Sequence, residues 1–293
     1  MQKYSIFNLI KNAFSNHEKW DLAWKDPTPK KEYDVVIIGG GGHGLATAYY
    51  LAKEHNITNV AIIEKGWIGG GNVGRNTTII RSNYMHDDNA LFSEFGMDLW
   101  RRMSQDLNYN VMFSPRGIIN LAHSDAQMNT YARRGNSMRL NGIDAELLSR
   151  EQVKEIIPMA DFSENVRFPI FGGLMQPSAG TARHDAVAWG YARQADSMGV
   201  DIIQNCEVTG FDVSEGKIKG VRTSRGDIKV NKIGLCVAGS TNILADKLNM
   251  TLPVETHLLQ ACVSEPVKPV LDRVVTFGAG HFYISQSDKG EMV

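Results

Sequence analysis

Residues 34–65, DVVIIGGGGHGLATAYYLAKEHNITNVAIIEK, join two apolar runs through a glycine turn and a helical pattern. Both runs have the length and the β-branched content of buried strands. The segment between them is long enough for a helix and repeats its apolar residues at helical spacing. This order predicts a β-α-β unit, and with it a nucleotide-binding fold.

The turn carries Gly39, Gly41 and Gly44 in the spacing GxGxxG. The first two glycines allow a tight turn and close approach of a pyrophosphate, the third lets helix and strand pack, and the helix N-terminus faces the anion. Glu64 ends the second strand, where a carboxylate can accept hydrogen bonds from a ribose. The pattern predicts a dinucleotide site; the alternative interpretation is a glycine-rich structural turn.

A second glycine-rich loop follows, WIGGGNVGRNTTIIRSNY at residues 67–84. Its small and polar residues would let backbone amides approach the phosphates or the ring of a flavin. The alternative is an ordinary solvated loop.

The stretch AGTARHDAVAWGYARQA, residues 179–195, places His184 and Asp185 at the start of a predicted helix. Asp185 suits the first helical turn because of the helix dipole. His184 has two interpretations, a surface or cap residue and a residue that carries chemistry, and the local sequence leaves both open.

Composition limits the classes of function. The chain has 293 residues, 43% of them hydrophobic, and a net charge of −1, so it can form a proper core but has no field that would attract nucleic acid. Cys206, Cys236 and Cys262 lack metal or disulfide spacing, so we expect buried thiols and no metal site. No apolar run reaches the roughly 18 residues of a membrane span, so we expect a cytoplasmic protein.

The remaining pattern predicts two interleaved domains of α/β class. We expect a hairpin over 110–124, helices over 125–142 and 144–158, four short strands over 199–230, and a strand leading into a helix over 232–248. Residues 1–32 are expected to form an amphipathic helix and a linker. The two domains are then a Rossmann-like dinucleotide domain, 33–105 and 178–250, and a mixed-sheet α+β substrate domain, 106–177 and 251–293.

Long stretches of the chain resemble the β subunits of heterotetrameric sarcosine oxidase, within the glycine oxidase and D-amino-acid oxidase flavoprotein superfamily. The stretches that carry the resemblance are GGGGHGLATAYYLAKEH, EKGWIGGGNVGRNTTIIRSNY, DLNYNVMFS, GTARHDAVAWGYARQADSMGVDIIQNCEVTGF and SEPVKPVLD. It implies an FAD-binding domain of the glutathione-reductase type. It also implies that the family continues beyond residue 293, so we expect the chain to lack a C-terminal segment and to be inactive alone.

The resemblance implies roles for individual residues. Besides the GxGxxG glycines and Glu64, seven residues match family positions that hold FAD. They are Gly42, His43, Asn72, Val73, Thr77, Ile79 and Val208. Arg81 matches an arginine that binds the substrate carboxylate, and Tyr283 loosely matches an aromatic residue near the substrate. His184 matches the histidine that carries FMN covalently. Residues 66–80 contain no histidine, so FAD should be noncovalent.

The implied activity is oxidation of sarcosine at FAD, with electrons passed to FMN and oxygen reduced to hydrogen peroxide. Partner subunits would complete the FMN site and process the one-carbon product with tetrahydrofolate. Two alternatives stay open: a single-flavin secondary-amine dehydrogenase subunit of the dimethylglycine or proline type, and a noncatalytic flavin-carrying electron-transfer subunit.

Overall fold

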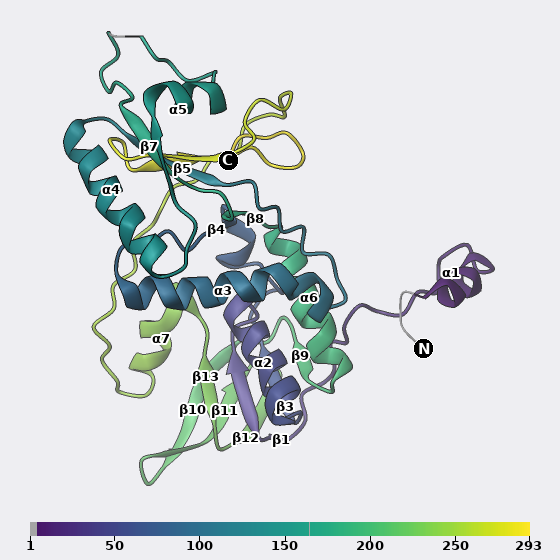
Figure 1. The fold of residues 1–293 in the computed structure, drawn as a ribbon. Coiled ribbons are helices and arrows are strands. Elements are labelled where there is room, and N and C mark those ends of the chain that lie inside the picture. The colour runs from purple at the N-terminus through teal and green to yellow at the C-terminus, as the bar shows by residue number, and fades with distance from the viewer. Residues whose placement is uncertain (1–4, 164) are drawn as a thin grey trace. The chain divides into compact units, whose positions relative to one another are not determined.

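A computed structural model describes residues 5–163 and 165–293 (Figure 1). Contacts divide the chain into two compact units, the first formed by 1–72 with 191–255 and the second by 73–190 with 256–293. These boundaries differ from the predicted ones. Residues 73–105 and 178–190, expected in the dinucleotide domain, belong to the second unit, and the described N-terminal residues 5–32 cluster with the first.

The first unit contains two four-stranded sheets. The parallel one has the order β13-β2-β3-β9 and the other the order β1-β12-β11-β10. The strands are β1 (Glu32–Tyr33), β2 (Val35–Ile38), β3 (Val60–Ile63), β9 (Asp201–Ile203), β10 (Val208–Ser214), β11 (Lys217–Thr223), β12 (Gly226–Val230) and β13 (Ile233–Leu235). The helices are α1 (Ile6–Ala13), α2 (Gly42–His55), η2 (Ala238–Ser240) and α7 (Thr241–Asp246), and α6 (His184–Ser197) enters this unit at Tyr191.

The predicted β-α-β unit is present. β2 pairs in parallel register with β3 from Val35↔Val60 to Ile38↔Ile63, and β13 and β9 extend the sheet on either side. Every residue of β3 is buried, as its continuous apolar run requires. Four short strands do occupy 199–230, but the first joins the parallel sheet, and the other three pair antiparallel with one another in the second sheet, where β1 pairs in parallel with β12.

The second unit is built on a mixed five-stranded sheet of order β15-β14-β5-β7-β6. Its strands are β5 (Ile118–Ala122), β6 (Glu146–Ser149), β7 (Gly172–Gln176), β14 (Val274–Phe277) and β15 (Phe282–Ile284), and a separate pair joins β4 (Ile79–Ile80) to β8 (Gly180–Thr181). Its helices are η1 (Val73–Arg75), α3 (Asp87–Asp106), α4 (Asp125–Leu140) and α5 (Arg150–Ile156), with the start of α6.

Two local predictions in this unit are wrong. The hairpin over 110–124 does not form, because β5 pairs with β14 and β7, and Ser114 bridges to Thr181 instead. The helix over 144–158 begins only at Arg150, since Glu146–Ser149 pair with β7. Ser149 then caps α5 with Gln152 in a reciprocal capping box, which fixes where strand gives way to helix.

The cysteines also depart from expectation. Cys206 is buried, Cys236 half-buried and Cys262 exposed, and all three are free thiols. In the part of the chain that the structure describes, no helix is long and apolar enough to cross a membrane.

Candidate functional site

The glycine turn lies at the carboxyl edge of the parallel sheet. Gly39 follows β2 with φ of +110°, and a Cβ there would overlap the carbonyl oxygen of Cys236 after β13. A Cβ on Gly44 would overlap the carbonyl oxygen of Gly39. Positions 39 and 44 therefore accept only glycine, because the turn is packed backbone against backbone.

Helix α2 starts directly from this turn. Gly41 is its N-cap and supplies no side-chain hydrogen bond to the first turn. The first backbone N–H groups of a helix have no partner within the helix, and the dipole of this 14-residue helix makes its start positive. The cradle has the backbone donors and the dipole that suit a pyrophosphate, and binding of one at Gly39, Gly41, Gly42 and Gly44 stays a prediction.

Glu64 has a structural task that the sequence did not predict. One carboxylate oxygen accepts a hydrogen bond from the Gly40 backbone N–H (2.7 Å) and the other from the Gly66 N–H (2.8 Å). The side chain thereby ties the glycine turn to the end of β3. Each oxygen retains a lone pair, so binding of a ribose by Glu64 stays a prediction.

Val208 is placed by the same edge of the sheet. Cys206 donates its backbone N–H to Glu64 O (2.9 Å), and Asn205 donates to Gly66 O (2.8 Å). Val208 begins β10 two residues later and is buried in the core of the first unit. Its predicted role, a backbone contact with adenine, requires such a fixed main chain.

Cys236 is a neighbour of the cradle that sequence reasoning missed. Its backbone N–H bonds Ile38 O (2.8 Å), which closes β13 onto β2 just before the glycine turn. Burial raises the pKa of the Cys236 thiol, and the hydroxyl of Thr47 on α2 opposes the shift. The thiol is therefore neutral at physiological pH and adds no charge near the start of α2.

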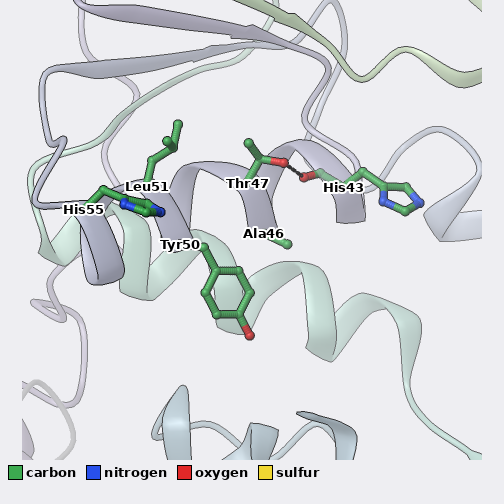
Figure 2. Close-up of a pocket in the computed structure, with 6 residues that line it drawn as sticks. All are labelled: His43, Ala46, Thr47, Tyr50, Leu51 and His55. Carbon is green, nitrogen blue, oxygen red and sulfur yellow. Dashed lines mark hydrogen bonds between the residues drawn. The ribbon is translucent and has the colours of Figure 1, made fainter. Parts of the chain in front are cut away.

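A hollow of about 350 Å³ lies on one face of α2. Figure 2 shows the residues that line it, which are His43, Ala46, Thr47, Tyr50, Leu51 and His55. The hydroxyl of Thr47 donates to His43 O (2.7 Å), one helical turn earlier. The exposed imidazole of His43 lies at the end of the hollow nearest the glycine turn. Its predicted contact with the ADP half of FAD is untested by this geometry.

The second glycine-rich loop leads into β4 of the second unit. Asn72 is exposed and Val73 opens η1. The Thr77 hydroxyl and the Tyr283 hydroxyl on β15 are 2.8 Å apart. Thr78 has φ of +62°, which is unusual for a β-branched residue, and Asn76 Oδ1 stabilises the turn by accepting its N–H (2.6 Å). Strain of this kind is often found beside ligands.

The segments that carry Arg81 and His184 are paired in the antiparallel β4–β8 ladder. Ile79 lies opposite Thr181 and Ile80 opposite Gly180, so Arg81 follows the ladder at one end and His184 follows it at the other. A Cβ on Gly180 would overlap Ser114 O, which makes glycine necessary there.

His184 is the first residue of α6 and is half-buried. One guanidinium beside it is shared by two carboxylates: Arg183 contacts the Asp185 carboxylate through Nη2 (3.0 Å) and the Asp288 carboxylate through Nη1 (3.0 Å). Asp185 Oδ1 also accepts the N–H of Ala186 (2.8 Å). Burial would raise the pKa of Asp185, but these hydrogen bonds and the Arg183 charge lower it overall. Among the described residues, no hydrogen bond engages the His184 imidazole.

Arg81 is half-buried and has no carboxylate partner in the described part of the chain. Its Nη1 donates to Asn83 Oδ1 (2.6 Å), and its guanidinium lies 4.6 Å from the centre of the Tyr84 ring. A guanidinium has five N–H donors, so most of them are free to bind an anion. Tyr283 is 44% exposed and is joined to Thr77 rather than to Arg81.

A family model described as FAD dependent oxidoreductase matches residues 34–293. A sarcosine oxidase subunit beta of Rhizobium meliloti (strain 1021) is 59% identical over 291 residues, covering 99% of this chain and 70% of the relative. The chain belongs to the FAD dependent oxidoreductases and, within them, to the sarcosine oxidase β subunits.

Two further comparisons support the same family and the same fold. A sarcosine oxidase subunit beta of Rhodobacter capsulatus is 52% identical over 293 residues, covering 100% of this chain and 70% of the relative. Among solved structures, L-proline dehydrogenase from P. horikoshii has a TM-score of 0.80 and 26% identity, covering 90% of this chain and 69% of that one. The predicted fold class and the FAD cofactor are therefore confirmed.

Proposed function

We propose that this flavoprotein oxidises sarcosine at noncovalent FAD, as the β subunit of a hetero-oligomeric sarcosine oxidase. The observation that supports the proposal best is Arg81, a half-buried guanidinium with no carboxylate partner among the described residues. A site of that kind suits a small substrate that carries its own carboxylate. The relatives named sarcosine oxidase subunit beta point to an N-methylated glycine.

In this proposal the chain binds and orients. The cradle at Gly39–Gly44 holds the pyrophosphate, Glu64 the ribose and Val208 the adenine end, while Asn72, Val73, Thr77 and Ile79 line the loop beside the flavin. Arg81 fixes the substrate carboxylate by charge-assisted hydrogen bonds, so the amine and its methyl group point away from it, and Tyr283 lies near the substrate. Bound FAD supplies the acceptor for a hydride from the methyl group.

His184 is proposed to carry FMN through a covalent bond. The residues fit such a group, because the imidazole is half-buried and engages in no hydrogen bond with a described residue, and because Arg183 is neutralised by Asp185 and Asp288. Bound FMN would supply the site at which the enzyme is reoxidised, with oxygen reduced to hydrogen peroxide. Partner subunits would complete this site and transfer the one-carbon product to tetrahydrofolate. Three free thiols suit a reducing compartment, and we propose the cytoplasm.

Anaerobic titration of the purified complex with sarcosine tests the proposal. We expect the FAD absorbance to bleach in proportion to added sarcosine. The likeness to L-proline dehydrogenase supports one rival, so L-proline is titrated in parallel. Bleaching by proline alone would favour a single-flavin dehydrogenase, and no bleaching by either amine would favour a noncatalytic electron-transfer subunit.

A further inference from the structure

Two arginines converge on Asn83, a residue with no exposed surface. Arg81 donates from Nη1 to the side-chain Oδ1 (2.6 Å). Arg134 on α4 donates from Nε to the backbone O (2.6 Å), and its Nη2 contacts the same oxygen. Side chain and main chain of one buried residue thus join two guanidinium groups.

Neither guanidinium forms an ion pair with any residue that the structure describes. Glu94, which contacts the neighbouring Ser82 hydroxyl (2.6 Å), is paired with Arg101 (3.0 Å). Burial lowers the pKa of Arg134, and the positive charge of Arg81 lowers it further. Two partly buried like charges without a counter-charge are costly, and a bound anion would relieve the cost.

The Asn83 amide is held in one orientation. Its Nδ2 donates to Asn120 Oδ1 on β5 (2.8 Å), and Asn120 Nδ2 donates to the hydroxyl of Thr276 on β14. Asn120 and Thr276 are opposite one another in the parallel β5–β14 ladder, so this series of side-chain hydrogen bonds ends on the sheet. Because Nδ2 is committed to Asn120, Oδ1 must face Arg81. A flipped amide would set donor against donor.

We propose that Arg81 and Arg134, joined through Asn83, form one carboxylate-recognition site, in which Arg81 contacts the carboxylate while Asn83 and Arg134 are positioning residues. Arg134 holds the Asn83 main chain, and its charge strengthens the attraction for the anion. This inference rests on the proposed function, since it takes the ligand of Arg81 to be the carboxylate of a small amino acid. It adds a second cation and an orienting amide that the sequence did not indicate.

The test compares Arg134→Gln with Arg133→Gln in the assembled, flavin-loaded complex. Arg133 is the matched control, because it precedes Arg134 on α4, is exposed and forms no ion pair among the described residues. Anaerobic stopped-flow reduction of FAD gives the limiting rate and the apparent Kd for two probes, sarcosine and its amide without a carboxylate, N-methylglycinamide.

For Arg134→Gln we expect the Kd of sarcosine to rise roughly tenfold, as for loss of one charge-assisted interaction, with the limiting rate within about twofold of wild type. The Kd of the amide should change by less than about twofold, because this probe has no carboxylate for the Arg134 charge to attract. Arg133→Gln should match wild type for both probes. An equal rise for both probes, or no rise for sarcosine, overturns the proposal.

Asn83→Asp provides a second variant that keeps the shape of the side chain. Its carboxylate should pair with Arg81 and compete with sarcosine, so we expect a Kd increase of about tenfold or more with a much smaller effect on the amide. An unchanged Kd would also overturn the inference. The proposed function fails separately, if Arg81→Lys leaves the sarcosine Kd unchanged or if wild-type FAD is not reduced at all.

Discussion

Arg81 carries the substrate specificity proposed for this flavoprotein. Arg81→Lys replaces a planar fork with a point charge, and loss of a charge-assisted hydrogen bond costs about 1.5–3 kcal/mol. We therefore expect a raised apparent Kd for sarcosine in anaerobic FAD reduction, with FAD content unchanged. If the affinity stays at the wild-type value, the carboxylate is bound elsewhere.

His184 is tested by the fate of the flavin after acid precipitation. In His184→Ala we expect no flavin to remain with the precipitated chain, while FAD binding and FAD reduction by sarcosine persist, since the two flavins are proposed to occupy separate sites. The measurement is flavin absorbance in the pellet and in the supernatant. Acid-stable flavin in the variant would remove His184 from its role.

At the scale of elements, the strand–turn–helix of the cradle depends on close backbone packing. Gly44→Ala would place a Cβ against Gly39 O, and we expect a loss of about 1–3 kcal/mol in the free energy of unfolding together with weaker FAD binding. Urea titration and FAD content measure both effects. Gly71→Ala is the control, because its Cβ would meet nothing within 4 Å; equal losses in the two variants would refute the packing argument.

The start of α6 should respond to pH through Asp185. Its hydrogen bonds to Arg183 and Ala186 lower its pKa in the folded state, so its carboxylate stabilises the fold above the ordinary pKa of about 3.9. This contribution is lost as pH falls through the lower folded pKa. The free-energy gap between wild type and Asp185→Asn should thus be present near about pH 7 and shrink below about pH 4. A gap that does not depend on pH in chemical denaturation would contradict this linkage.

At the scale of the whole molecule, each unit has its own core. Ile62 is fully buried in the parallel sheet of the first unit, and Ile119 is fully buried in the mixed sheet of the second. Ile62→Ala should cost about 2–5 kcal/mol. We expect faster amide hydrogen exchange in peptides from β2, β3 and β9, with peptides from β5 and β7 little changed. Equal acceleration in all of them would show that the two units open together.

Local sequence determined the nucleotide-binding half of this protein. The apolar runs, the glycine spacing and Glu64 lie within 32 consecutive residues, and strand, turn and helix propensities there all favour one structure. Helix α4 was also predicted from its own residues, and in the structure the Ser124 side chain caps its start. The roles of Arg81 and His184 were inferred only from the resemblance to the family. The sequence did not show which side chains lie near them.

Tertiary structure alone decided the pairings between distant segments. The sequence of 110–124 is typical of a hairpin, yet β5 pairs with β14 and β7. A buried strand inside a sheet needs a neighbour on each side, and a hairpin would supply only one. The same pairing sets Asn120 opposite Thr276, and helix packing brings Arg134 to Asn83 from 51 residues away. No local pattern encodes such contacts, since they depend on which strands share a sheet. The second cation beside Arg81 was therefore visible only in the folded chain.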